Sequence, residues 1–466
     1  MTTADLAARA AASAFPAVSA APRSERAAWL TALADALEAD RDELVALAHR
    51  ETHLSVARLD GEVTRTANQL RFFAGALRDG GYLEASVDSA DPSTVPPRPD
   101  LRRMLRPIGP VAVFGASNFP FAFSVLGNDT ASALAAGCPV VVKAHPGHPE
   151  LSRRVAELAV RALREAGAPD GTFALVEGMD EGIALVAHPA IRAVGFTGSL
   201  RGGRALFDIA NGRPDPIPFY GELGSMNPVV VTPGAVDRID ELALGLVASF
   251  TRDGGQYCTK PGIVFAPAGA GLPEAVRALA AAVEPHRLLT PGMEAAFASR
   301  TNSIADGAVT ADGVAPVVVA TTVDELAADR ERYLEECFGP HTVVVEYADR
   351  DELHRALALL PGSLTASVHH APREDVGEFV TALAPRAGRI IFNGWPTGVA
   401  IAWSQHHGGP WPATTGSIHT SVGATAIRRF LAPIAYQDAP AEVLPEELRD
   451  GNPLGIPRRE DGVLKA

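Results

Sequence analysis

The run Val111-Ala-Val-Phe114 begins an alternation of short apolar runs and amphipathic helical segments that decides the fold class. Further apolar runs follow at residues 139–143, 173–176, 193–196 and 218–223. Strands that alternate with helices are typical of a parallel sheet whose helical crossovers cover both faces. We therefore expect a doubly wound α/β domain in this part of the chain.

A second series of apolar runs predicts another α/β domain, which begins near Gly224. The expected strands lie at residues 228–231, 262–265, 317–320, 342–347, 366–369 and 389–393, with a helical segment at 238–251. The alternation again favours parallel pairing.

The segments outside the two series have different patterns. From Ala4 to Leu77, alanine and leucine recur at three- and four-residue spacing, which predicts amphipathic surface helices. Residues 86–99 are rich in Ser, Asp and Pro, so we expect an extended arm over residues 82–106. Residues 425–437 alternate in polarity, which predicts a strand that pairs far away in sequence or on another subunit.

The composition narrows the class of protein. The 466 residues are 47% hydrophobic and 21% charged, which is enough apolar material for a large core in two or three domains. The net charge of −14 argues against a nucleic-acid surface, so a small-molecule partner is expected. Three cysteines without CxxC spacing exclude a disulfide framework. Together with a neutral to acidic N-terminus and no run of about 18 apolar residues, this predicts a cytoplasmic protein outside the membrane.

One cysteine lies in a polar, glycine-bounded loop, Gly255-Gln-Tyr-Cys258-Thr-Lys260, directly before an expected strand. Most free cysteines are small buried hydrophobes. The polar neighbours of Cys258 disfavour an apolar pocket, and Gly254 and Gly255 permit the tight backbone that presents a side chain. We therefore interpret Cys258 as a candidate nucleophile, and Cys138, in an apolar run, as structural.

Two other polar residues can serve such a thiol. Glu222 ends an apolar run, so burial would raise its pKa and suit it to general base catalysis; a glutamate on a solvated strand end would have no such role. Asn118 follows a strand and a small-residue turn. Its amide is an oxyanion donor if it faces the thiol, and an ordinary turn asparagine otherwise.

Candidate ligand sites lie at the ends of expected strands. The segment Gly198-Ser-Leu-Arg-Gly-Gly203 opens a helix and can present backbone N–H groups to a phosphate, but it departs from GxGxxG and equally fits a plain turn. Lys143 ends a strand where ligands of open α/β sheets gather; the alternative is a solvated lysine. The thirteen histidines do not pair with carboxylates at ligand spacing, so no metal is expected.

Taken in order, the motifs of the chain resemble those of the aldehyde dehydrogenase superfamily. They are Ser117-Asn-Phe-Pro120, Val142-Lys143, Gly195-Phe-Thr-Gly-Ser199, Glu222-Leu-Gly224, Gly255-Gln-Tyr-Cys258 and Glu336-Cys-Phe-Gly-Pro340. Each motif is weak alone, but the ordered set with these separations is very specific. The resemblance spans nearly the whole chain and implies two doubly wound α/β domains plus a β-arm for oligomerisation.

The resemblance implies a function for each part of the chain. It places an NAD(P)-binding Rossmann-like domain at residues 1–81 and 107–223 and a catalytic domain at residues 224–415. It assigns residues 82–106 and 420–445 to a bridging arm, which implies a homodimer or homotetramer.

The resemblance also assigns roles to the candidate residues. Cys258 is the nucleophile that forms a thiohemiacetal and then a thioester, and Glu222 is the base for its hydrolysis. Asn118 and the Cys258 N–H form the oxyanion hole. The residues that hold the cofactor are Lys143, Phe196, Gly198, Ser199, Leu223, Glu336 and Phe338.

The C-terminal half is most similar to the 2-oxoglutarate semialdehyde (2,5-dioxopentanoate) dehydrogenase branch, which works in sugar-acid and hydroxyproline catabolism. The similar stretches are Asn393-Gly-Trp-Pro-Thr-Gly398, His407-Gly-Gly-Pro410, Thr420-Ser-Val-Gly423 and Ala426-Ile-Arg-Arg-Phe430. The substrate of this branch carries a carboxylate that needs a cation. On the helical segment 62–74, Arg65 and Gln69 share a face and are the candidate anchors, with Arg71 second; the alternative is that all three are surface residues.

One departure from the family pattern bears on the cofactor. Many members carry a glutamate three residues after the cofactor lysine, whereas Lys143-Ala-His-Pro146 lacks the acid. A carboxylate there would chelate ribose hydroxyls and repel a 2′-phosphate, so its absence favours NADP over NAD. Candidate phosphate partners are His145, His148 and Arg201, and the acids that would oppose them are Asp180 and Glu181.

Other functions stay open on the sequence alone. A dehydrogenase of long-chain or other apolar aldehydes would share the catalytic residues but lack a cation in the substrate tunnel. A catalytically silent binding homologue is disfavoured by the combination of Cys258, Glu222 and Asn118. A thiol hydrolase would need an imidazole beside Cys258, and His407 is the candidate.

Overall fold

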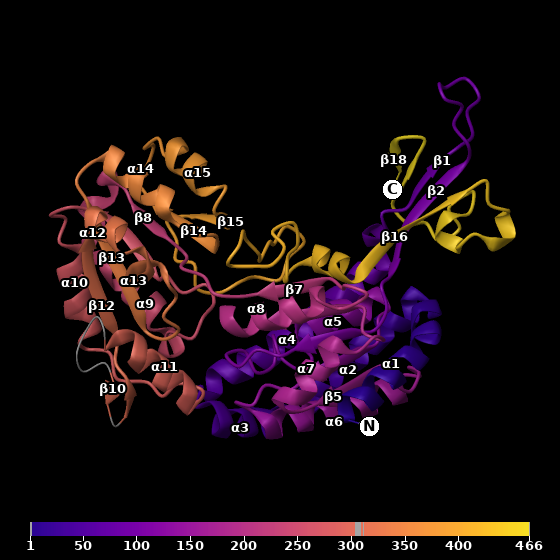
Figure 1. Cartoon of the computed structure of the whole chain (residues 1–466), viewed down its shortest axis with the longest axis horizontal. Helices are drawn as coiled ribbons and strands as arrows, with labels where there is room; N and C mark the ends of the chain where they lie inside the picture. The colour runs from indigo at the N-terminus through magenta and orange to yellow at the C-terminus, as the bar shows by residue number, and fades with distance from the viewer. Residues whose placement is uncertain (1, 303–308, 311, 466) are drawn as a thin grey trace.

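The computed structural model describes residues 2–302, 309–310 and 312–465. Residues 1, 303–308 and 311, which fall within the predicted domains, lie outside the described residues. Figure 1 shows three parts: a first part that holds the N-terminal helices, a second part at the left of the view, and an arm at the upper right.

Five parallel strands form the sheet of the first part, in the order β5-β4-β3-β6-β7. They are β3 (Val111–Phe114), β4 (Val140–Lys143), β5 (Phe173–Val176), β6 (Ala193–Thr197) and β7 (Phe219–Glu222). Each falls within a predicted strand or within one residue of it, and the doubly wound topology is confirmed. The order reverses at β3, so the loops that follow β3 and β6 open where such sheets bind ligands.

Helices cover this sheet. They are α1 (Thr3–Ala20), α2 (Arg23–Ala39), α3 (Arg41–Thr52), α4 (Val56–Asp79), α5 (Asn128–Ala136), α6 (Pro149–Glu165), α7 (Met179–Ala187) and α8 (Leu200–Asn211). The Ser55 side chain caps α4 by accepting the Arg58 N–H at 3.3 Å, and Gly80, with a φ of 79°, ends it. α4 is amphipathic as predicted: packing against α2 and α5 buries Gln69 and Phe73 completely, while Asp60, Thr64 and Asn68 are exposed.

The second part is built on six parallel strands in the order β12-β13-β9-β8-β14-β15. They are β8 (Val229–Val231), β9 (Ile263–Pro267), β12 (Val317–Thr322), β13 (His341–Tyr347), β14 (Ser363–His369) and β15 (Ala387–Phe392). All six coincide with predicted strands, with ends that differ by up to three residues. A short antiparallel ribbon, β10 (Val309–Thr310) and β11 (Gly313–Val314), lies apart from this sheet.

The helices of the second part include the predicted segment at 238–251, which is α9 (Ile239–Phe250) preceded by the 3₁₀ turn η2 (Pro233–Arg238). The others are α10 (Leu272–Ala280), α11 (Pro291–Thr301), α12 (Val323–Ala328), α13 (Arg330–Leu334), α14 (Arg350–Leu359) and α15 (Gly377–Leu383). A 3₁₀ turn, η3 (Arg252–Gly255), follows α9 and leads into the loop that carries Cys258.

The arm is a five-stranded sheet in the order β16-β2-β1-β17-β18. Its strands are β1 (Ser86–Asp88), β2 (Leu101–Pro107), β16 (Leu431–Gln437), β17 (Arg458–Glu460) and β18 (Val463–Lys465). β16 pairs antiparallel with β2, with Gln437 opposite Leu101, so the C-terminal strand pairs far away in sequence as expected. The prediction of a strand from residue 425 is wrong, because η4 (Ala424–Phe430) is a 3₁₀ helix. Its apolar residues Ala426, Ile427 and Phe430 all point into the core, which alternation on a strand would not allow.

The segment between β15 and η4 runs along the junction of the first and second parts (Figure 1). On one side the Leu223 N–H, just after β7, donates to the Ala413 carbonyl at 2.8 Å. On the other side the Gly362 N–H, just before β14, donates to the Trp411 carbonyl at 3.2 Å. This junction segment therefore places its own side chains between the ends of the two sheets.

Candidate active site

The loop that carries Cys258 makes a sharp turn after α9. Asp253, Gly254 and Gly255 have φ values of 48°, 70° and 70°. A Cβ on Gly255 would lie 2.3 Å from the Gly339 carbonyl, so only glycine fits where these two backbone segments touch. The sequence prediction that these glycines shape the loop is confirmed.

The Cys258 sulfur faces two side chains of opposite chemistry. Its Sγ lies 3.7 Å from His407 Nε2, and the same nitrogen lies 4.0 Å from Glu222 Oε2. Burial raises the pKa of the Cys258 thiol to about 12, and the carboxylates of Glu222 and Glu336 add to the rise. The thiol therefore needs a proton acceptor before it can act as a nucleophile at neutral pH.

Glu222 ends β7 and points toward the thiol from the first part of the molecule. Burial raises its pKa well above the ordinary value; Asp129 adds to the rise and Arg429 opposes it. Ser421 also opposes the rise through a side-chain hydrogen bond to the carboxylate. The raised pKa favours the protonated carboxyl and makes the ionised form a stronger base than an exposed glutamate, and the burial agrees with that expected for Glu222 from the sequence.

Asn118 lies in the loop that follows β3 and faces the loop of the nucleophile. Its side-chain Nδ2 donates to the Gln256 carbonyl at 2.9 Å, two residues before Cys258. The structure therefore places Cys258, Glu222 and the loop of Asn118 near one another from three distant segments, and the oxyanion role of the Asn118 amide stays a prediction.

Arg58, which sequence reasoning missed, ties these segments to α4. Its guanidinium donates to Glu62 Oε2 at 2.7 Å, to Asp253 Oδ2 at 2.8 Å and to the Asn118 carbonyl at 2.7 Å. The guanidinium also stacks 4.6 Å from the centre of the Phe119 ring. Arg58 thus clamps the Asn118 loop and the turn before Cys258 to the same helix.

Glu62 completes this clamp from the next turn of α4. Its Oε1 accepts the N–H groups of Phe121 and Ala122, both at 2.9 Å. Burial raises the pKa of Glu62, while Arg58 and the two N–H groups oppose the rise. A signal for both residues was available in the sequence, because their four-residue spacing places an acid and a base on one helix face.

The three candidate substrate residues of α4 separate into two groups. Gln69 is fully buried, and Arg65 is partly buried with its guanidinium 5.2 Å from the centre of the Phe123 ring. Arg71 instead binds Asp35 at 2.6 Å and Glu38 at 2.5 Å on the outer surface, and these carboxylates raise its pKa. Arg71 is therefore placed away from the candidate site.

Arg65 is weakly held for a partly buried cation. Its hydrogen bonds to Gln69 Oε1 and to the Val399 carbonyl are both 3.5 Å long. Burial lowers the pKa of Arg65, and the negative charge of Glu62 and of an ionised Cys258 oppose that fall. The guanidinium keeps donor capacity for an anion beside the thiol.

Arg389 on β15 is a second cation near the thiol that sequence reasoning took only as part of a strand. Its guanidinium donates to the carbonyls of Pro396 and Gly398, both at 3.0 Å, and its buried Nε has no partner. Its charge lowers the pKa of both Cys258 and His407. No sequence pattern marked it, because its charge acts on Cys258, which lies more than a hundred residues away in the chain.

The candidate cofactor residues at the first sheet lie around the ends of β4 and β6. Burial lowers the pKa of Lys143 at the end of β4. Ser199 caps α8 by accepting the Gly202 N–H at 3.2 Å. A Cβ on Gly198 would lie 2.8 Å from the Phe196 ring, and one on Gly203 would lie 2.2 Å from Leu223, so the turn is compact. Such a turn presents backbone N–H groups at a helix N-terminus.

Glu336 and Phe338 precede β13 on the opposite side of the site. Burial raises the pKa of Glu336 to about 7, while Lys260 and the Ser225 N–H oppose the rise. A Cβ on Gly224 would lie 2.8 Å from Glu336 Oε2, so the absence of a side chain at Gly224 makes space for the Glu336 carboxylate. A lysine, a helix N-terminus and a carboxylate in this order suit the hydroxyls and phosphates of a nicotinamide dinucleotide.

The residues weighed for a 2′-phosphate differ in what they can offer. Burial lowers the pKa of His145 to about 3, and its Nδ1 accepts the Gly147 N–H, so the ring is neutral. The ring of His148 is fully buried between Ala116 O and Ser152 Oγ, both at 3.1 Å. The side chain of Glu181 accepts the Ala4 N–H at 2.5 Å at the start of α1. Arg201, on the first turn of α8, is the exposed cation of the group.

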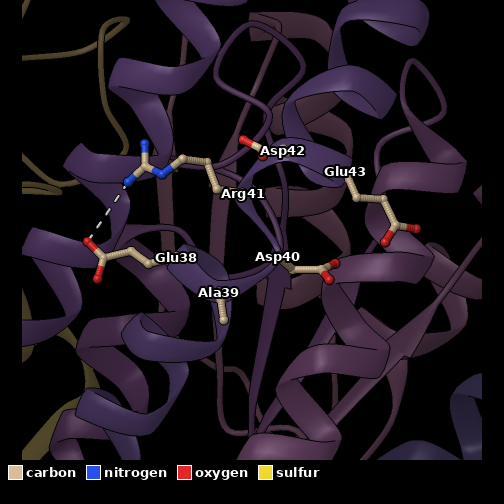
Figure 2. Close-up of a pocket in the computed structure, with 6 residues that line it drawn as sticks. All are labelled: Glu38, Ala39, Asp40, Arg41, Asp42 and Glu43. Carbon is tan, nitrogen blue, oxygen red and sulfur yellow. Dashed lines mark ion pairs between the residues drawn. The ribbon is translucent and has the colours of Figure 1, made fainter.

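A hollow of about 330 Å³ lies far from these residues, between α2 and α3 (Figure 2). Its lining residues are Glu38, Ala39, Asp40, Arg41, Asp42 and Glu43. Several of these acids already bind arginines: Glu38 pairs with Arg41 at 4.0 Å, and Asp40 and Glu43 pair with Arg154 at 2.9 and 3.0 Å. The hollow is an ion-paired surface feature.

No three His, Cys, Asp or Glu side chains within residues 2–302, 309–310 and 312–465 gather where they could hold a metal ion. Within the same residues, no helix combines the length and apolarity that crossing a bilayer requires.

Comparison with known proteins gives consistent matches. The model of the aldehyde dehydrogenase family matches residues 1–305. The chain is 46% identical to alpha-ketoglutaric semialdehyde dehydrogenase 2 of Azospirillum brasilense, over 96% of this chain and 89% of that protein. It is 41% identical to the alpha-ketoglutaric semialdehyde dehydrogenase of Acinetobacter baylyi, over 99% of this chain and 91% of that protein.

A solved structure shares the fold. It is that of 1-pyrroline-5-carboxylate dehydrogenase from Thermus with bound NAD, with a TM-score of 0.78 and 24% identity. The match covers 93% of this chain and 85% of the other. The two doubly wound sheets and the arm are therefore an arrangement that a dehydrogenase of known structure also has.

Proposed function

The chain belongs to the aldehyde dehydrogenase family, and on that premise we propose that it oxidises 2-oxoglutarate semialdehyde to 2-oxoglutarate with NADP or NAD. Two relatives with 46% and 41% identity over nearly the whole chain carry the name of this activity. The observation within the site that carries the substrate assignment is the partly buried, weakly held guanidinium of Arg65, whose charge interacts with that of an ionised Cys258.

The proposed chemistry uses the three groups that the fold brings together. The Cys258 thiolate attacks the aldehyde carbon, and the resulting oxyanion is held by the Asn118 amide and the Cys258 N–H. When bound, the nicotinamide accepts the hydride that leaves this tetrahedral carbon. Glu222 then takes a proton from the water that hydrolyses the thioester, and the carboxylic acid leaves.

A substrate carboxylate would complete the surroundings of Arg65. A buried cation is stable only when its donors are satisfied, and two 3.5 Å hydrogen bonds leave the Arg65 guanidinium poorly satisfied. A carboxylate forms two parallel charged hydrogen bonds with such a group. Gln69 accepts from Arg65 through Oε1 and donates to the Ala122 carbonyl at 3.4 Å, so it would hold the guanidinium in place for the substrate carboxylate.

For the cofactor, we assign Lys143, Ser199, Gly198, Phe196, Leu223, Glu336 and Phe338 to the binding site and favour NADP. His145 is neutral and His148 is committed to Ala116 and Ser152, so Arg201 is the phosphate partner that we retain. Glu181 is occupied at the start of α1, which reduces its repulsion of a 2′-phosphate.

We also propose the three-part division that the motifs imply, with a cofactor domain at 1–81 and 107–223, a catalytic domain at 224–415 and an arm at 82–106 and 420–445. The strands of the two parallel sheets fall between Val111 and Glu222 and between Val229 and Phe392, which supports the boundary at 223. An arm whose outer strands are open edges supports a homodimer or homotetramer.

The proposal is tested by initial rates of nicotinamide reduction with 2-oxoglutarate semialdehyde, succinate semialdehyde and hexanal, each with NAD and NADP. We expect the highest kcat/KM with 2-oxoglutarate semialdehyde. Arg65→Gln, which keeps most of the side-chain volume, should lower that kcat/KM by about 10- to 100-fold and leave hexanal oxidation unchanged.

Arg71→Gln is the matched control, because Arg71 lies on the same helix but binds Asp35 and Glu38 on the outer surface. Arg71→Gln should leave kcat/KM unchanged for both substrates. A preference of the wild-type enzyme for hexanal, or an equal loss with both substrates in Arg65→Gln, would refute the assigned substrate.

A further inference from the structure

His407 is held rigidly in the junction segment. Its N–H donates to Thr420 Oγ1 at 2.8 Å, and its carbonyl accepts the Ser421 N–H at 2.8 Å. The side chain is 3% exposed. A Cβ on Gly408 would lie 2.6 Å from the His419 carbonyl, and one on Gly409 would lie 2.1 Å from the Ser363 carbonyl. The two glycines after His407 therefore let this backbone pack closely enough to carry the ring into the site.

The ring of His407 lies between the two groups that exchange protons in the proposed reaction. Its Nε2 is 3.7 Å from Cys258 Sγ and 4.0 Å from Glu222 Oε2. Nε2 is the hydrogen-bonding partner of Sγ, and Ser421 hydrogen-bonds the Glu222 carboxylate. One nitrogen thus faces both the proton donor and the proton acceptor.

Burial and nearby cations keep the His407 imidazole neutral. Burial lowers the pKa of His407 to about 3, and nearby cations add to the fall. The titratable and charged groups that face the ring are Cys258, Glu222, Arg389, Arg65, His406 and Arg429. A neutral ring has a free lone pair on one nitrogen, so it can accept a proton briefly without holding it.

We propose that His407 is a catalytic residue that carries the thiol proton of Cys258 to Glu222 and returns a proton to the sulfur at the end of the reaction. The second half of this role, the return of a proton to the sulfur, rests on the proposed function, because only hydrolysis of a thioester requires it.

The transfers balance over one turnover. The S–H bond breaks, its electron pair stays on sulfur, and the proton bonds first to His407 Nε2 and then to Glu222 Oε2. Glu222 releases this proton to solvent before hydrolysis. The water that attacks the thioester gives its proton to Glu222 as the C–S bond breaks, and His407 passes that proton to the departing thiolate. The sulfur is again a thiol, and the carboxylic acid ionises in solvent.

The first half is tested without substrate, by the rate at which iodoacetamide alkylates Cys258 in the full-length enzyme at pH 7. Mass spectrometry of the peptide that contains Cys258 separates this reaction from any at Cys138 and Cys337. His407→Asn removes the proton acceptor with little change of polarity, and we expect alkylation at least about 10-fold slower. His406→Asn, the adjacent histidine, should react at the wild-type rate. An unchanged rate in His407→Asn would overturn the relay.

Glu222→Gln gives an independent test, because the relay and simple electrostatics predict opposite changes in the alkylation rate. The negative charge of Glu222 raises the pKa of the Cys258 thiol, so its removal alone would ionise more sulfur and speed alkylation. The relay predicts slower alkylation, because the final proton acceptor is lost. Faster or unchanged alkylation would contradict it, and this test stands even if His407→Asn fails to fold.

A double variant tests whether the two residues act in one chain. The relay predicts that His407→Asn combined with Glu222→Gln alkylates no more slowly than the slower single variant, whereas independent effects would multiply. Failure of the proposed function has another signature: wild-type alkylation would retain its dependence on His407 and Glu222 while no aldehyde is oxidised.

Discussion

The loop that carries Cys258 and the turn that carries Cys138 both bury a thiol, but they surround it differently. Burial raises the pKa of Cys138 to about 11 and that of Cys258 to about 12. The Cys138 sulfur donates to the Phe430 carbonyl at 3.4 Å within the largest apolar core. The Cys258 sulfur meets an imidazole, with a carboxylate beside it. Burial alone therefore does not mark a nucleophile; the groups that can move a proton do.

Substitution of the two thiols should show this difference most strongly. Cys258→Ala removes the nucleophile and should lower kcat by at least about 10³-fold. Cys138→Ala should leave kcat unchanged and lower the free energy of unfolding by about 1 kcal/mol, because it leaves a small cavity. Nicotinamide reduction and denaturant unfolding measure the two effects. If both variants lost activity equally, the comparison would fail.

The oxyanion donor should give the next largest effect. Asn118→Ala removes the amide that faces the Cys258 loop and should lower kcat by about 10²- to 10³-fold. The rate of Cys258 alkylation should stay near that of the wild type, because Asn118 takes no part in thiol ionisation. A variant with normal kcat would show that the amide is an ordinary turn residue.

Loss of the Arg58 clamp should lower kcat moderately. The turn that carries Cys138 has no comparable role in activity. Arg58→Lys keeps the charge but cannot donate to Glu62, Asp253 and the Asn118 carbonyl at once. We expect kcat to fall by about 10-fold, with a smaller change in KM, because the loops are less well positioned. Arg41→Lys, at a partly exposed, ion-paired arginine of α3, is the control. A kcat in Arg58→Lys equal to that of the control would show that Arg58 does not position the loops for catalysis.

Glu336 should give the smallest effect, on cofactor binding. Its pKa near 7 means that the carboxylate is mostly protonated at pH 6 and mostly ionised at pH 8. If the carboxylate accepts hydrogen bonds from ribose hydroxyls, cofactor Kd should fall by about fivefold as the pH rises from 6 to 8. Glu336→Gln should abolish this dependence in fluorescence titrations. A Kd that rises over this range would reverse the sign and refute the role.

The sequence predicted the parts of the fold that depend on local pattern. Each strand of the two parallel sheets was marked by an apolar run, since strands buried on both faces tolerate few polar residues. The η4 segment was mistaken for a strand, because seven residues are too few to separate helical from alternating burial. The loop of Cys258 was predictable because glycine is needed where φ is positive.

The site was less predictable where it depends on contacts between distant segments. Cys258 and Glu222 stood out through their neighbours in sequence. The roles of Arg58 and Arg389 come from hydrogen bonds and charges across the junction, which no local pattern records. His407 was named from the sequence only as the imidazole that a thiol hydrolase would need, and the junction segment places its ring 3.7 Å from the sulfur.

The most direct test of the central claim is the mass of the enzyme after it reacts. Glu222→Gln, which slows hydrolysis, is incubated to completion with 2-oxoglutarate semialdehyde and NADP, then quenched in acid and digested. We predict that the 2-oxoglutaryl group is bound as a thioester on the peptide that contains Cys258, with one nicotinamide reduced per bound group. An acyl group on another residue, or reduced cofactor without any bound group, would contradict the account.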